Sequence, residues 1–186
     1  MPALRNRLQP RSGGDHGPER TRRLFFAFWP DEATREAMHH AARKAVRGSG
    51  GRPVPAANLH VTVAFLGSVA ESRVDEVRAA GREVPVGPAF EIVFDGVAFW
   101  SKPQVLVAAS SQPAPEAAAI AARLWAGLVP LGIPPDVRPF KPHVTLARKV
   151  VKPAPELSLK PVRWPVSALT LVESVTDPEG SRYTPI

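Results

Sequence analysis

Apolar residues follow two different spacings along the chain, and each spacing predicts one kind of secondary structure. Continuous or alternating apolar runs that end at Gly or Pro are typical of strands, and they occur at 24–29, 59–67, 90–100, 104–110, 140–150, within 162–175 and at 181–186. The first of these runs, LFFAFW, is apolar throughout and predicts a strand that is buried on both faces. Apolar residues that recur every three or four positions predict amphipathic helices, which we expect at 31–47, 71–84 and 115–132. The segment 48–58, rich in Gly and Pro, is a predicted loop.

The predicted elements follow a similar order in the two halves of the chain. Each half supplies strands around a helix and contains one strand that begins His-Val-Thr. This repetition predicts a duplicated, bilobal α+β unit with a cleft between its halves, formed by residues 23–186 as a single domain. Residues 1–22 are polar, contain Gly and Pro and lack aromatic side chains, so we expect a disordered basic tail there.

Composition narrows the possible classes of function. The chain has no Cys, which excludes disulfides, thiol catalysis and thiolate metal ligands and favours a reducing, cytoplasmic location. Its longest apolar stretches are too short to span a bilayer, so no membrane association is expected. The net charge is +7, but six arginines against two acids lie in residues 1–23, so the remaining chain carries only a mild positive bias.

The two strands that begin His-Val-Thr are near-copies, HVTVAFLG at 60–67 and HVTLARKV at 143–150. Because side chains alternate along a strand, His60 and Thr62 share one face of the first copy. His143 and Thr145 likewise share one face of the second copy. Imidazole titrates near neutrality, so a neutral ring can act as general base while a protonated ring acts as general acid. Threonine hydroxyls can donate to phosphate oxygens, and two such faces turned toward each other would suit in-line attack on a phosphodiester.

A purely structural interpretation competes with this one, because a histidine in a core strand can satisfy a buried carbonyl. One His-x-Thr strand alone fits that interpretation well, whereas two of them in apparently duplicated units do not. No metal or other cofactor is expected, since the chain has no Cys, no third His motif and no His-Glu-x-x-His pattern. His39 and His40 lie together on the helix predicted at 31–47, where we expect a solvated or partly packed pair.

The chain resembles the 2H phosphoesterase superfamily, which is named for two His-x-Thr/Ser-x motifs. Within that superfamily, NLHVTVAFLG and FKPHVTLAR are very similar to the signatures of the RNA 2′,3′-cyclic phosphodiesterases, historically called 2′-5′ RNA ligases. RRLFFAFWPDEATRE resembles the opening strand and helix of that family. LTLVESV, followed by Gly180 and Tyr183, resembles its closing strands, so the resemblance extends over nearly all of residues 22–186.

The resemblance implies a fold and a set of roles. The implied fold is bilobal and α+β, with two mainly antiparallel sheets flanking a central cleft and helices on the outside. The implied reaction is metal-independent hydrolysis of a terminal 2′,3′-cyclic phosphate to a 2′-phosphate. His60 would be the acid that protonates the departing 3′-oxygen, and His143 the base that activates water. Thr62 and Thr145 would bind the phosphate, as would Arg148, which matches an arginine implicated there in phosphate contact.

Residues beside the motifs have roles that the sequence leaves open. Strict alternation from His143 places Arg148 on the opposite face, so it reaches the phosphate only if the strand bends or ends before it. Phe140, just before the second motif, is the aromatic residue that we select for stacking on a nucleobase. Arg52 either attracts RNA phosphates or is an ordinary exposed charge.

The expected partner is RNA with a 2′,3′-cyclic phosphate end, or a small cyclic-phosphate nucleotide, bound by a monomer. Two other functions would use the same residues. An RNA-end binding module without turnover is one, although binding alone does not require two titratable groups. Ligation of RNA through a 2′-5′ bond is the other, and we expect it only as a side reaction, because water outcompetes a hydroxyl nucleophile in dilute solution.

Overall fold

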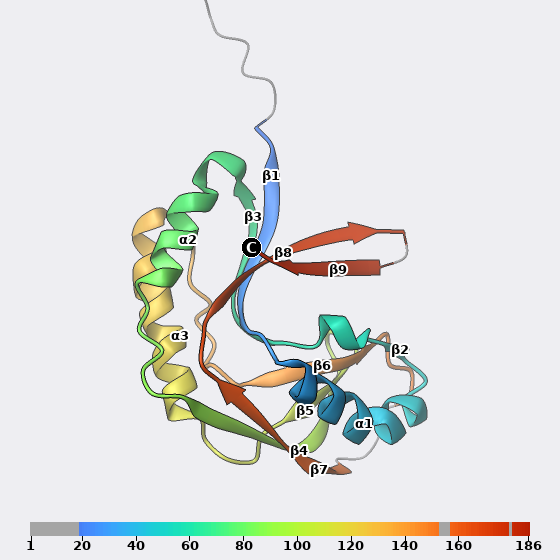
Figure 1. Ribbon diagram of the computed structural model, residues 1–186. Coiled ribbons are helices and arrows are strands. Elements are labelled where there is room, and N and C mark those ends of the chain that lie inside the picture. The colour runs from blue at the N-terminus through green and yellow to red at the C-terminus, as the bar shows by residue number, and fades with distance from the viewer. Residues whose placement is uncertain (1–18, 153–156, 179) are drawn as a thin grey trace, which may run out of the picture.

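The computed structural model describes residues 19–152, 157–178 and 180–186, and Figure 1 shows the arrangement of their elements. The strands are β1 (Thr21–Phe28), β2 (Arg52–Pro53), β3 (Val61–Ala70), β4 (Phe90–Trp100), β5 (Val105–Ala109), β6 (His143–Arg148), β7 (Leu157–Val166), β8 (Thr170–Asp177) and β9 (Gly180–Pro185). The helices are α1 (Glu32–Gly48), α2 (Val74–Arg82) and α3 (Pro115–Leu128), with single 3₁₀ turns η1 (Ala56–Asn58), η2 (Glu71–Arg73) and η3 (Val129–Leu131).

The strands form one path in the order β7-β4-β5-β6-β3-β1-β8-β9, with β2 added beside β6. Every pairing among the described strands is antiparallel. The path narrows at its middle, where β3 and β6 share a single residue pair, Val61 with Val144. The molecule therefore has two antiparallel halves, and the strands that begin His-Val-Thr are the two that meet. The α+β fold with mainly antiparallel sheets is confirmed.

The helices begin and pack where the sequence pattern predicts. Asp31 caps α1, because its side chain accepts a hydrogen bond from the backbone N–H of Thr34 at 2.7 Å. Figure 1 shows α2 and α3 side by side, whereas α1 packs against β7 in the other half. Gly81 lets α2 approach the sheet closely, since a Cβ at this position would overlap the ring of Phe26. No helix in the described part of the chain has both the length and the apolar character needed to cross a bilayer.

Strand β1 is buried on both faces, as its continuous apolar run predicts. Leu24, Phe26 and Phe28 belong to the main core. Phe25 and Ala27, on the other face, form a second small cluster with Val172 of β8, against which Trp29 and Tyr183 pack. This second cluster lies on the same face of the sheet as the functional residues described below.

The structure differs from the sequence expectations at three places. The predicted loop at 48–58 contains the short strand β2 and the 3₁₀ turn η1. The single strand expected within 162–175 is two strands, β7 and β8, and no Gly or Pro in the intervening residues 167–169 marks the break. Residues Thr21 and Arg22, which the expectation included in the tail, form the start of β1. Arg22 makes an ion pair with Glu173 of β8 at 2.6 Å, and this contact ties the start of the strand to the sheet. Residues 1–18 of the expected tail lie outside the described residues.

Candidate active site

Both histidines lie where the two halves of the sheet meet. Val61 and Val144 are directly opposite each other in an antiparallel pair. Extending this register by one residue in each direction places His60 opposite Thr145 and Thr62 opposite His143, and residues opposite one another share a face. All four side chains are half-buried, whereas the two valines between them are fully buried on the other face. We call the face that carries His60, Thr62, His143 and Thr145 the histidine face.

A β-bulge follows the motif in both strands, at the same position. In β6, Thr145 lies opposite Val107 and Ala147 opposite the adjacent Leu106, so Leu146 is the extra residue. In β3, Val63 is the extra residue in the same way, between Thr62 and Ala64. Each bulge lies three residues after its histidine. The duplication thus extends from the sequence of the motif to the irregularity of the strand that carries it.

The bulge in β6 determines where Arg148 lies. Arg148 is opposite Val105 and Thr145 is opposite Val107, two residues of β5 that share one face. Arg148 therefore lies on the histidine face, not on the opposite face that strict alternation requires. Its guanidinium is exposed, and its Nη2 atom lies 3.5 Å from the hydroxyl of Tyr183 in β9. Arg52 of β2 is opposite Arg148, so a second guanidinium group extends from the same face.

Each histidine is held in the same way by the backbone two residues before it. The Nδ1 atom of His60 lies 2.7 Å from the carbonyl oxygen of Asn58, and that of His143 lies 2.8 Å from the carbonyl oxygen of Lys141. A carbonyl can only accept a hydrogen bond, so Nδ1 is the protonated nitrogen in both neutral rings. The lone pair of each ring is therefore on Nε2. Neutral histidine with a free Nε2 is the form that can accept a proton.

His60 is surrounded by aromatic rings from the small cluster, which lies on the same face of the sheet. The ring centroids of Phe25, Trp29 and Tyr183 lie 4.8, 5.9 and 5.1 Å from that of the imidazole, and the Trp29 ring is nearly parallel to it. Burial lowers the pKa of His60 to about 4, and the positive charges of Arg148 and His143 act in the same direction. Its Nε2 atom lies 3.0 Å from the Thr62 hydroxyl, which donates to it in the neutral state.

His143 has a more open environment. The indole of Trp100, at the end of β4, lies 4.4 Å away and is tilted by 50° to the imidazole. Burial lowers the pKa of His143, and the positive charge of Arg138 lowers it further. The hydrogen bond to the Lys141 carbonyl acts in the opposite direction and raises this pKa. No group of the described residues hydrogen-bonds Nε2 of this ring. Its lone pair is therefore available to a water molecule.

The comparisons with known proteins identify the family of the chain. The family model described as the 2′-5′ RNA ligase superfamily matches residues 29–178. The chain belongs to this superfamily. The 2H phosphoesterase resemblance noted in the sequence is thereby confirmed.

Superfamily members of known name and structure cover most of the chain. The RNA 2′,3′-cyclic phosphodiesterase of Thermus thermophilus is 33% identical over 174 residues, which are 87% of this chain and 86% of the relative. The Escherichia coli protein of the same name is 30% identical over 168 residues, 88% of this chain and 93% of the relative. The crystal structure of E. coli LigT complexed with 3′-AMP matches with a TM-score of 0.80 and 31% identity, covering 90% of this chain and 96% of that one.

The superfamily motifs do not include all the side chains on the histidine face. Phe65 lies opposite Phe25, which belongs to the small cluster, so Phe65 is on the histidine face as well. It is 51% exposed, and the guanidinium of Arg23 lies 4.9 Å above its ring. Phe65 occupies in β3 the position that Arg148 occupies in β6. Phe140, the aromatic residue selected from the sequence, instead packs against the main core.

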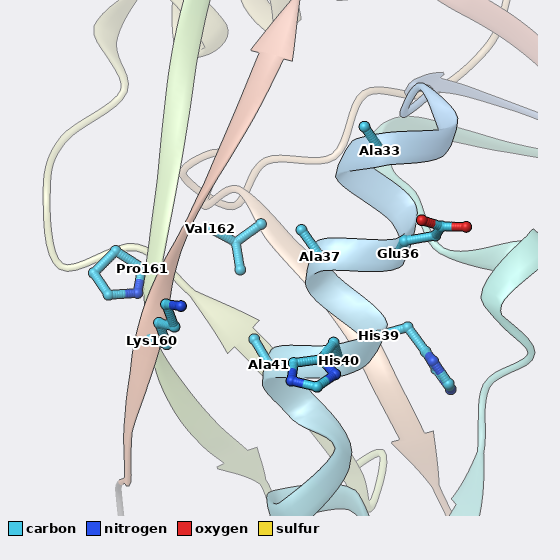
Figure 2. Close-up of a pocket in the computed structure, with 9 residues that line it drawn as sticks. All are labelled: Ala33, Glu36, Ala37, His39, His40, Ala41, Lys160, Pro161 and Val162. Carbon is cyan, nitrogen blue, oxygen red and sulfur yellow. The ribbon is translucent and has the colours of Figure 1, made fainter.

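One further pair of histidines lies outside the histidine face. His39 and His40 line a groove of about 600 Å³ between α1 and β7, in which Figure 2 shows Ala37 and Ala41 turned toward Val162. The described residues contain no group of three or more His, Cys, Asp or Glu side chains arranged to hold a metal ion.

Proposed function

We propose that this protein hydrolyses the 2′,3′-cyclic phosphate end of RNA to a 2′-phosphate by acid–base catalysis with two histidines. The observation that carries the proposal is the pair of imidazoles on one face, each fixed through Nδ1 so that Nε2 remains for proton transfer. The names of the relatives from T. thermophilus and E. coli support the same reaction. No metal is required, because the two rings supply both proton transfers.

The proposed reaction begins with attack of water on phosphorus, in line with the bond to the 3′-oxygen. Nε2 of His143 takes the proton of the attacking water as a new P–O bond forms. The P–O3′ bond breaks, and Nε2 of His60 gives its proton to the departing 3′-oxygen. The products are a 2′-phosphate and a free 3′-hydroxyl. The resemblance to the family suggests this division of roles, and the open Nε2 of His143 supports it.

Binding of the phosphate allows His60 to take up the proton that it needs from solution. Without a ligand, burial and the charge of Arg148 keep this imidazole neutral at neutral pH. A bound phosphate anion pairs with Arg148 and favours the protonated ring, so the pKa of His60 rises when substrate binds. The Thr62 hydroxyl, no longer needed at Nε2, can then donate to a phosphate oxygen, as we propose for Thr145 as well.

Two arginines give the histidine face a charge suited to an anion. Arg148 and Arg52 lie opposite each other, and like charges in opposite positions repel when nothing lies between them. Neither has a carboxylate partner among the described side chains, in contrast to Arg22, Arg35, Arg73, Arg78, Arg138 and Arg163. A phosphate group placed between His60 and Arg148 would relieve this repulsion.

The nucleobase has a platform in Phe65. This ring is exposed on the histidine face, and the cation of Arg23 covers part of it. Stacking on an exposed aromatic ring is tolerant of base identity. We therefore place the base of the terminal nucleotide at Phe65 instead of Phe140.

Product analysis with an oligonucleotide that ends in a 2′,3′-cyclic phosphate tests the proposal. We expect a 2′-phosphate product and full activity in EDTA. His60→Ala and His143→Ala should each lower kcat/KM by about 10²–10⁴-fold, the range typical of lost acid–base catalysis. His39→Ala, on the outer surface of α1, is the matched control and should retain wild-type activity.

Three results would contradict the proposal in different ways. Binding of the oligonucleotide without turnover at any pH would favour an RNA-end binding module. A 3′-phosphate product would reverse the assigned bond cleavage. Near-normal activity in either histidine variant would remove that ring from the mechanism.

A further inference from the structure

Arg148 differs from the ion-paired arginines of this protein in the charge of its partner. Six other arginines each hold an aspartate or glutamate. The side-chain partner of Arg148 is the neutral hydroxyl of Tyr183, 3.5 Å from Nη2, which is a long hydrogen bond. The guanidinium is therefore held at one end while its positive charge stays uncompensated.

Tyr183 is fixed at its other end by the aromatic cluster. It lies opposite Ser174 in the β8–β9 hairpin, and its ring meets Phe25 edge-on at 5.2 Å. The same ring lies 5.1 Å from His60 and is almost perpendicular to it. A single side chain thus contacts His60 through its ring and Arg148 through its hydroxyl. These two partners belong to different halves of the sheet.

We propose that Tyr183 is a positioning residue, whose hydroxyl directs the Arg148 guanidinium toward the phosphate site beside His60. The inference rests on the proposed function and adds a residue to it. A carboxylate in the place of the hydroxyl would hold the guanidinium more strongly. It would also cancel the charge that is needed for the phosphate and repel the phosphate itself. A tyrosine orients the cation without this cost.

The test is a double-mutant cycle between Tyr183 and Arg148, measured first by the binding of inorganic phosphate. Tyr183→Phe keeps the ring against His60 and removes only the hydroxyl. We expect it to weaken phosphate binding about 3- to 10-fold, the size of one lost hydrogen bond. In the Arg148→Gln background the same substitution should change binding less than 2-fold, because the hydroxyl no longer has a guanidinium to direct.

The kinetics of the cyclic-phosphate substrate give a second readout. Tyr183→Phe should raise KM by about 3- to 10-fold and change kcat much less, since the proton-transferring rings stay in place. Tyr183→Leu, which also removes the ring from His60, should in addition shift the acidic limb of the pH–rate profile. A merely structural tyrosine would lower thermal stability without this separation of KM from kcat.

The possible results distinguish the inference from the proposed function. Equal losses of phosphate affinity in both backgrounds, or no loss in either, would overturn the role of Tyr183. Wild-type protein that binds phosphate but hydrolyses no cyclic phosphate would overturn the proposed function. In that case the binding cycle still decides whether Tyr183 positions Arg148.

Discussion

At the scale of single residues, the main property of the site is that both imidazoles are neutral before substrate binds. Burial lowers the pKa of each ring, most strongly at His60, where it falls to about 4. A ring with so low a pKa is a poor proton donor in the free protein. In the proposed mechanism, His143 is therefore ready to act as the base before substrate binds, whereas His60 becomes an acid only when the phosphate anion is bound.

The buried His60 should make the fold sensitive to acid. Its pKa in the fold, about 4, lies below the ordinary value of 6.5, so the unfolded chain binds more protons between these values. Stability is therefore full above pH 6.5 and falls as the pH decreases toward 4, by about 3 kcal/mol in total from this group.

Denaturant unfolding of wild type and His60→Gln at pH 7 and pH 4.5 measures this effect. Between these pH values the wild type should lose about 2 kcal/mol more unfolding free energy than the variant. Equal losses in the two proteins would mean that the ring is protonated in the fold without penalty.

At the scale of elements, the two β-bulges determine which side chains lie on the histidine face. Without the extra residues Val63 and Leu146, alternation would turn Phe65 and Arg148 away from the histidines. Counted from the histidine, each bulge lets the sixth residue join the first and third on one face. Because the sixth residues differ, one strand contributes an aromatic ring and the other a cation.

The position of the base can be tested by comparing two phenylalanines. Phe65→Ala should lower kcat/KM for a cyclic-phosphate nucleotide about 5- to 150-fold, since base stacking on an aromatic ring contributes roughly 1–3 kcal/mol. Phe140→Ala should instead lower the melting temperature with little effect on kcat/KM, because Phe140 packs against the core. A large loss of kcat/KM in Phe140→Ala, with little loss in Phe65→Ala, would instead indicate that the base stacks on Phe140.

At the scale of the whole molecule, the sequence predicts what depends on local order. The helices, most of the strands and the shared face of His60 and Thr62 follow from periodicity, whereas the short strand β2 and the break between β7 and β8 were not predicted. The bulges and the single pair Val61–Val144 depend on partners far along the chain, so no local pattern reveals them. For this reason, side-chain alternation alone could not decide on which face of the sheet Arg148 lies. Phe65 lies within an apolar run of the sequence, so nothing in the sequence distinguishes its exposed ring from an ordinary buried strand residue.

Substrate binding by the whole protein should take up a proton. At pH 7 both rings are neutral without a ligand, and the proposed reaction requires one of them to be protonated. Calorimetric titration with inorganic phosphate in buffers of different ionisation enthalpy should give an uptake that approaches one proton. His60→Gln should abolish this uptake. An unchanged uptake in the variant would assign the proton to another group.

The pairing of Val61 with Val144 has a consequence for the direction of bond cleavage. It relates the two His-Val-Thr segments by a local twofold axis, while the 2′ and 3′ oxygens of a ribose are not equivalent. A fully symmetric site would accept the cyclic phosphate in either of two orientations. Phe65 on one side of the axis and Arg148 on the other make these orientations unequal in energy. In the proposed reaction, the difference between the two copies, more than their likeness, would therefore select which of the two ester bonds is broken.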